Sequence, residues 1–162
     1  NNIKVFPDLI SVDVKLKFDI IRMNWSLEHV HSPSDYFKFV FERLNKGGIF
    51  IISVPNYDGL LYKYNKELVE LPIHLYHFTI KDIKNYADKY NFDILEITTF
   101  SYPQMYNFAA KYDKGLKRIF TNLSFLETYF VQKGISLMDQ LNYGNDMIFV
   151  LKKNPSQYNN LD

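Results

Sequence analysis

The sequence predicts a mixed α/β fold, with parallel central strands, an antiparallel last strand and flanking helices. Three observations predict it. Compact apolar runs of strand length occupy residues 18–23, 49–54 and 147–151. Between the first two lies a segment with helical spacing, which is typical of two parallel strands joined by a right-handed crossover. Residues 92–100 add an alternating segment rich in β-branched residues, which predicts a further strand.

The composition is that of one ordinary globular domain. The chain has 162 residues, of which 47% are hydrophobic and 23% charged, and its formal net charge is +1. We expect a single domain over residues 1–153 and a flexible polar tail over 154–162. A small net charge disfavours nucleic acid as a partner, and no apolar run is long enough to span a membrane. The absence of cysteine excludes disulfides and suits a cytoplasmic protein.

The first strand leads directly into polar residues. Residues 1–17 alternate imperfectly and contain Pro7, so they predict one or two short strands or an irregular segment. The strand then ends at Asn24, and Ser26, Glu28 and His29 follow it. In open α/β sheets, ligands bind beyond the carboxyl ends of the strands, so this is where we expect a ligand.

The next segments predict a helix, a strand and a loop. Pro33 and a capping serine, Ser32 or Ser34, indicate a helix start, and Gly47 indicates its end. A buried strand follows. Residues 55–72 have little periodicity and predict a loop with a short helix at the ligand edge.

The last third predicts more helix than strand. Thr79 and Asp82 have the spacing of a capping box, and the helix that they begin should end near Asn91. Residues 103–143 form a long insertion in which apolar residues recur at helical spacing, which predicts two amphipathic helices. The insertion suits a lid, a homodimer surface or an element on a membrane surface.

Several motifs occur in an order that resembles a known family. FDII and LEHV in residues 18–30, LNKGG with IFIISVPN in 44–56, and HLYHFT in 74–79 are similar to the C-terminal half of class I S-adenosylmethionine-dependent methyltransferases. The resemblance is to the branch acting on small molecules, sugars and quinones. It implies a partial Rossmann-like sheet, S-adenosylmethionine as cofactor, and a small-molecule methyl acceptor, possibly a sugar.

One part of the family pattern is missing. Such enzymes normally open with a strand, a Gly-rich loop and a helix that hold the methionine end of the cofactor. Here the only adjacent glycines, Gly47 and Gly48, follow a predicted helix, and the chain begins Asn1 without a methionine. We therefore interpret the sequence as the later part of a methyltransferase domain, inactive when isolated. The alternative is a non-catalytic interaction module that acts through its helical insertion.

The resemblance also implies which residues contact the cofactor. Asn24, Trp25 and Leu27 follow the first strand, and Asp8 or, as the alternative, Asp13 lies where the family often meets the adenine. Two of these have ordinary structural alternatives, since Trp25 suits a core position and Asp8 a solvated turn.

His74 and His77 are the candidate catalytic bases, because methyl transfer to a hydroxyl requires a proton acceptor. In an extended segment their spacing of three would place them on opposite faces, so that only one reaches the acceptor. His29, Tyr57 and Tyr76 are the candidate substrate contacts, with structural packing as the alternative.

The Glu28-His29 pair raises the question of a metal. In a helical turn these neighbours should point about 100° apart. Related quinone methyltransferases carry a further Glu three residues before this pair, where this chain has Trp25. From the sequence we therefore expect no metal site.

Overall fold

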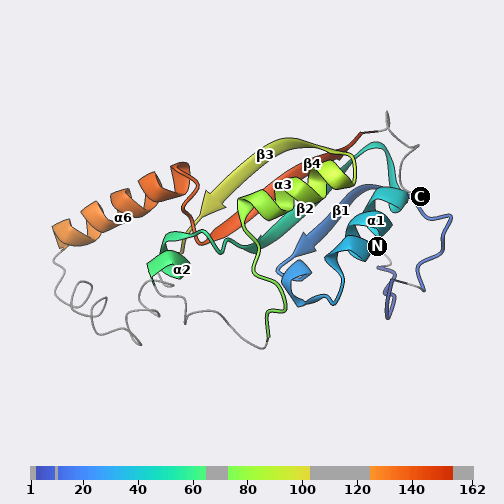
Figure 1. Cartoon of the computed structure of the whole chain (residues 1–162), viewed down its shortest axis with the longest axis horizontal. Helices are drawn as coiled ribbons and strands as arrows, with labels where there is room; N and C mark the ends of the chain where they lie inside the picture. The colour runs from blue at the N-terminus through green and yellow to red at the C-terminus, as the bar shows by residue number, and fades with distance from the viewer. Residues whose placement is uncertain (1–2, 10, 65–72, 103–124, 155–162) are drawn as a thin grey trace.

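A computed structural model describes residues 3–9, 11–64, 73–102 and 125–154 of the chain. These residues form a four-stranded sheet in the order β1-β2-β4-β3, with helices α1 and α3 on one face (Figure 1). In chain order the elements are β1 (Phe18–Asn24), the 3-10 helix η1 (Leu27–His29), α1 (Pro33–Arg43), β2 (Leu44–Pro55), α2 (Leu60–Tyr64), α3 (Ile80–Lys89), β3 (Phe92–Phe100), α6 (Phe125–Gln140) and β4 (Asp146–Lys153).

The strand directions confirm the predicted fold class. β1 pairs with β2 in parallel, and α1 connects them. β4, the last strand of the chain, lies between β2 and β3 and is antiparallel to both. Because β1 and β2 run in the same direction, their carboxyl ends meet at one edge of the sheet, which places Asn24 opposite Ser53.

The core lies between the sheet and the two helices. Phe37 of α1 is its centre: its ring is 5.4 Å from that of Phe50 in β2 and 4.9 Å from that of Tyr86 in α3. Phe37 and Phe50 are both fully buried. Aromatic rings at such separations add pair interactions to the burial of apolar area, so this cluster holds both helices on the sheet.

The opposite face of the sheet also carries apolar residues, which α1 and α3 do not cover. Ile51 and Val150 pair across β2 and β4 and are half-buried, whereas Ile20 of β1 is 61% exposed. Within the described part of the chain, β1 is an edge strand of the sheet, with β2 as its neighbour.

The predicted end of α1 was wrong. The helix ends at Arg43, and Leu44 already has an extended backbone and begins β2. Gly47, with φ +72°, lies within β2 where the register with β1 shifts. Its left-handed backbone therefore belongs to an irregular part of the strand and does not cap the helix. The carbonyl groups at the helix end are satisfied instead by Lys153 Nζ, which donates to Phe41 O at 2.6 Å and Leu44 O at 2.8 Å.

Both predicted helix starts are confirmed. Ser32 is the N-cap of α1 and accepts a hydrogen bond from the Asp35 backbone, which resolves the choice between the two serines. Thr79 and Asp82 form a complete capping box at α3. Residues 3–9 and 11–17 form turns and irregular backbone, as in the second alternative predicted for this segment.

The long insertion is only partly described. α6 confirms a helix in its second half, whereas the helix predicted around residues 108–123 lies outside the described residues. The tail at 155–162 also lies outside them, so the domain boundaries remain predictions. Among the described helices, none is long and apolar enough to cross a membrane.

Candidate active site

Trp25 is fixed at the carboxyl end of β1 by contacts with three other strands. Its backbone N–H donates to Ser53 O in β2 at 2.8 Å, and its indole Nε1 donates to Asp146 Oδ1 in β4 at 3.2 Å. Its ring meets the edge of Phe100 in β3 at 6.4 Å between centroids. Trp25 also has a positive φ of 44°, which is uncommon for a large side chain. These contacts hold the chain in the turn that leaves β1.

Asp146 was missed by the sequence analysis. It is 4% exposed, and burial raises the pKa of its carboxyl group, an effect opposed by the hydrogen bond from Trp25. The local sequence shows only a polar turn before a strand. The sheet register brings Asp146 to this edge, because it pairs with Pro55 on one side and Phe100 on the other.

The candidate cofactor residues are not all together. Asn24 is exposed at the end of β1, and its Oδ1 accepts a hydrogen bond from Arg22 at 2.7 Å. The Leu27 side chain is fully buried in the core, so only its backbone can face a cofactor. Asp8 closes a turn with Ser11, whose backbone N–H donates to its carboxylate at 2.8 Å.

The segment that contains Asp8 lies near the amino end of β1, far from the edge where Trp25 leaves the sheet (Figure 1). The turn alternative therefore describes Asp8 better than the adenine contact.

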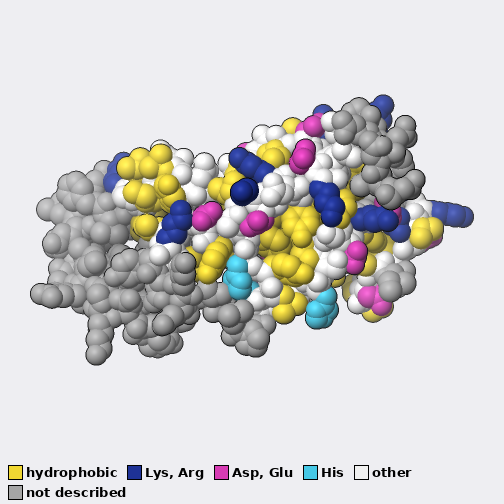
Figure 2. All heavy atoms as spheres, viewed as in Figure 1, with side chains coloured by type: hydrophobic (Ala, Val, Ile, Leu, Met, Phe, Trp, Pro, Cys, Tyr) yellow, Lys and Arg dark blue, Asp and Glu magenta, His cyan; other side chains and the backbone are white. Residues whose placement is uncertain are grey.

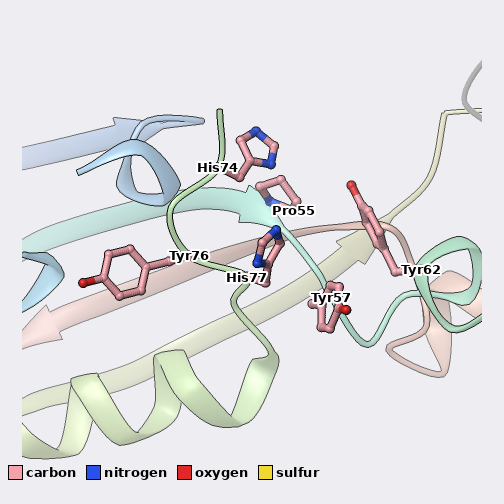
Figure 3. Close-up of a pocket in the computed structure, with 6 residues that line it drawn as sticks. All are labelled: Pro55, Tyr57, Tyr62, His74, Tyr76 and His77. Atoms are coloured by element: carbon pink, nitrogen blue, oxygen red, sulfur yellow. The ribbon is translucent and has the colours of Figure 1, made fainter. Parts of the chain in front are cut away.

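A pocket lies just beyond the carboxyl end of β2, and we call it the His77 pocket (Figure 3). The His77 ring is 5.2 Å from that of Tyr57 and 6.5 Å from that of His74. The residues that line the pocket are Pro55, Tyr57, Tyr62, His74, Tyr76 and His77.

Both candidate bases therefore border one pocket. Residues 73–79 form irregular backbone, so the alternation of a strand does not apply to them, and which histidine reaches an acceptor stays a prediction. His77 Nε2 is buried and has no hydrogen-bond partner among the described residues, which leaves this atom available for a hydrogen bond to a ligand in the pocket.

Tyr76 is oriented away from the other pocket side chains. In Figure 3 its ring points to the opposite side from those of His74, His77, Tyr57 and Tyr62. Its hydroxyl donates to His31 O at 2.9 Å, and its ring stacks on Phe78 at 5.8 Å. Tyr76 thus holds the segment in place, and its hydroxyl has a partner already.

Glu28, His29 and His74 form a second group beside the pocket. Glu28 is 1% exposed, and its Oε1 lies 3.8 Å from His29 Nε2. The rings of His29 and His74 are 4.8 Å apart. The expected divergence of Glu28 and His29 was wrong: neighbours in this short 3-10 helix leave the backbone about 120° apart, but the ends of these two side chains bend toward each other and meet at 3.8 Å. The sequence contains no signal that His74 joins them.

The charged side chains show no concentration of one sign on the face in view. Figure 2 shows Lys and Arg distributed over that face, interspersed with Asp and Glu, and two separate histidine clusters below the apolar centre. The site is therefore defined by imidazole, phenol and carboxylate groups more than by a large charged field.

The sequence of this chain matches a family model described as "Methyltransferase domain" over residues 4–97. The match covers more than half of the chain, and the chain belongs to this family. A search of curated proteins gave no match.

Solved structures of methyltransferases have a similar fold, all at low sequence identity. One, from Thermotoga maritima, is a SAM-dependent methyltransferase described as a possible histamine N-methyltransferase, with 16% identity and a TM-score of 0.53 over 86% of this chain and 59% of that one. A SAM-dependent methyltransferase from Archaeoglobus fulgidus has 17% identity and a TM-score of 0.54 over 92% of this chain and 66% of that one.

Phosphoethanolamine N-methyltransferase 2 of Haemonchus contortus, solved with S-adenosyl-L-methionine, has 20% identity and a TM-score of 0.50 over 84% of this chain and 33% of that one. This chain thus spans less than two thirds of the length of each of these three structures. The similarity confirms the Rossmann-like methyltransferase sheet predicted from the sequence.

Proposed function

We propose that this chain contributes the acceptor side of an S-adenosylmethionine-dependent methyltransferase, which methylates a hydroxyl or amino group of a small molecule. One observation carries the proposal: in a member of the methyltransferase family, His77 borders a pocket at the carboxyl end of β2, and its buried Nε2 has no hydrogen-bond partner in the described part of the chain. That edge is where α/β sheets bind their ligands.

The pocket residues fit the requirements of methyl transfer. When bound, S-adenosylmethionine supplies an electrophilic methyl group, which an oxygen or nitrogen lone pair must approach in line. A hydroxyl or ammonium acceptor must also lose a proton. His77 Nε2 is placed to take that proton, and the rings of Tyr57 and Tyr62, 5.9 Å apart, are placed to orient the acceptor.

The described residues fit one side of the cofactor. Exposed Asn24 and the backbone of residues 25–27 border the carboxyl end of β1. The family pattern places the Gly-rich loop and the ribose-binding acid on strands beyond that of β1. Within the described residues β1 has its outer edge free for such a neighbour, and Ile20 exposes an apolar side chain next to it.

The pocket is small in this structure: its cavity volume of about 10 Å³ is room for about one water molecule, so its size does not select an acceptor. Two of the similar structures are described as a possible histamine N-methyltransferase and a phosphoethanolamine N-methyltransferase, and both of these substrates carry an amine. A sugar, which the resemblance suggested, has no support from them.

Calorimetry with S-adenosylhomocysteine tests the proposal. The product inhibitor would be titrated into the 162-residue chain and into the complete product of the reading frame that encodes it. We expect binding by the complete product, together with methyl transfer from labelled S-adenosylmethionine to a panel of small amines and alcohols. A folded complete product that neither binds nor transfers would overturn the proposal and favour the non-catalytic interaction module.

A further inference from the structure

We propose that Asp146 is a positioning residue for the cofactor: its hydrogen bond with Trp25 sets the conformation of the turn that would contact S-adenosylmethionine. Asp146 acts through Trp25 and need not touch the cofactor itself. The inference rests on the proposed function, because it concerns the turn at the carboxyl end of β1 that we assign to cofactor binding. It adds to that turn a residue 121 positions further along the chain.

The turn formed by Trp25 and Ser26 has fixed residues on both sides. Before it, Asn24 pairs with Ser53 at the end of the sheet. After it, the Leu27 side chain is fully buried in the core. The side chain of Ser26 makes no capping hydrogen bond with η1. The contacts of Trp25 therefore decide where the backbone groups of the turn point.

Trp25 has a backbone conformation that needs support from its surroundings. Its φ of 44° lies in the left-handed region, which large side chains seldom occupy. Such conformations persist where the surrounding structure imposes them, and they concentrate at sites that bind ligands. The backbone N–H of Trp25 donates to Ser53 O at 2.8 Å, which fixes one side of the turn. The side chain has to fix the other.

Two contacts hold the indole ring of Trp25. Its Nε1 donates to Asp146 Oδ1 at 3.2 Å, and its ring meets Phe100 edge to face, with the centroids 6.4 Å apart. Trp25 is 37% exposed, so packing alone does not determine the orientation of the ring. An indole has a single N–H donor, so its hydrogen bond has one direction. Asp146 therefore supplies the directional restraint on the turn.

Asp146 suits this role because its own position is fixed. It is 4% exposed, and it pairs with Pro55 in β2 and with Phe100 in β3. The residue before it, Asn145, is fully buried, and its Oδ1 accepts a hydrogen bond from Leu61 N at 2.9 Å. A group on a rigid strand positions its partner more precisely than a group on a loop.

The carboxyl group of Asp146 contributes little to the stability of the fold. Burial raises its pKa, and the hydrogen bond from Trp25 opposes this effect only in part. Once ionised, the group is a buried charge, which is unfavourable for folding. Removal of the carboxylate also leaves the partly exposed indole free to bond water. An apolar replacement should therefore change stability little, which separates a positioning role from a structural one.

A double-mutant cycle in the complete product of the reading frame tests the inference. Asp146→Leu removes the acceptor, and Trp25→Phe removes the donor but keeps a ring against Phe100. We expect each substitution to weaken binding of S-adenosylhomocysteine about tenfold in calorimetry, as for the loss of one charged hydrogen bond. The double variant should lose no more than either single variant, because both remove the same interaction.

Two further variants serve as controls. Asp146→Asn keeps an oxygen that accepts the indole N–H, so its affinity should stay within about twofold of wild type. Asp88→Leu removes an exposed carboxylate of α3 and should leave the affinity unchanged. Urea unfolding of each variant measures stability independently of the cofactor.

Two readouts distinguish positioning from simple support of the fold. In the ligand-free protein, the NMR signal of the Trp25 indole N–H, assigned with Trp25→Phe, should shift in Asp146→Leu and much less in Asp146→Asn. In methyl transfer, Asp146→Leu should raise KM for S-adenosylmethionine and leave KM for the acceptor unchanged. The reason is that the turn lies at the end of β1, whereas the acceptor pocket lies beyond β2.

The possible failures can be told apart. Equal affinities of wild type and Asp146→Leu would overturn the inference and leave the proposed function intact, and so would additive losses in the double variant. A loss of affinity that Asp146→Asn shares, or that an equal loss of stability accompanies, would show a structural role and overturn it as well. A folded wild-type product that does not bind S-adenosylhomocysteine would overturn the proposed function, and the inference with it.

Discussion

The buried carboxyl group of Asp146, at the edge of the sheet that carries the site, makes the stability of the protein depend on pH. Its pKa is raised in the folded protein, so the folded state binds this proton more tightly than the unfolded state. The associated stability is present below the ordinary Asp pKa of about 3.9 and is lost as the pH rises through the raised folded pKa. Above that pH the folded protein contains a buried charge held by the indole of Trp25.

Asp146→Asn should remove this pH dependence. The amide oxygen can still accept the hydrogen bond from Trp25, but it carries no charge. We expect the free energy of unfolding of the wild type to fall relative to that of Asp146→Asn as the pH rises from about 4 through the folded pKa. Urea unfolding at several pH values, followed by the fluorescence of the only tryptophan, measures the difference. A constant difference across this range would contradict the prediction.

His77 is the residue whose substitution should most directly affect chemistry. In an active methyltransferase that contains this chain, His77→Gln should lower kcat about 10²–10⁴-fold with a smaller change in KM, because a general base acts in the transition state. The pH–rate profile should also lose its acidic limb, because activity falls at low pH when a general base is protonated. His31→Ala is the control, since that ring lies outside the pocket lining. An unchanged pH profile with lower kcat would show that His77 acts only structurally.

At the scale of elements, Lys153 links the last strand to the end of α1. Its ammonium is buried and donates to Phe41 O and Leu44 O, where a helix normally leaves carbonyl groups without partners. Burial lowers its pKa, and the charge of Lys17 adds to this. The interaction replaces the glycine cap that the sequence predicted.

Lys153→Met should leave these carbonyl groups unsatisfied and cost about 1–3 kcal/mol of stability. Methionine keeps an apolar side chain of similar length, so the loss of stability measures the contribution of the ammonium group. Lys152→Met is a matched control, because Lys152 is exposed on the same strand and should change stability by less than about 0.5 kcal/mol. Equal effects of the two substitutions in denaturant titrations would refute the capping role.

For the whole molecule, Phe37 determines how α1, α3 and the sheet pack together. Phe37→Ala removes a fully buried ring that contacts all three and should cost about 3–5 kcal/mol. Phe39→Ala, on the same helix but half-buried, should cost distinctly less. Both losses can be measured as shifts of the urea midpoint. A smaller loss of stability for Phe37→Ala than for Phe39→Ala would show that Phe37 is not at the centre of the core.

Local patterns predicted most of the fold because their causes are local. The capping box of Thr79 and the strand at residues 92–100 depend on neighbours within a few positions, and both occur as predicted. The end of α1 was wrong because Lys153, about 110 residues away, supplies the cap. No local pattern around Gly47 contains that information.

The sequence by itself determined the α/β class, the parallel and antiparallel strand directions, the family, and the region of the chain where a site would lie. Only the tertiary structure decided which residues meet there. It brought Asp146 to Trp25 through the sheet register, buried Leu27, and placed His74 beside Glu28 and His29. The physical reason is that backbone patterns depend on the next few residues, whereas side chains converge through hydrogen bonds and packing between segments far apart in sequence.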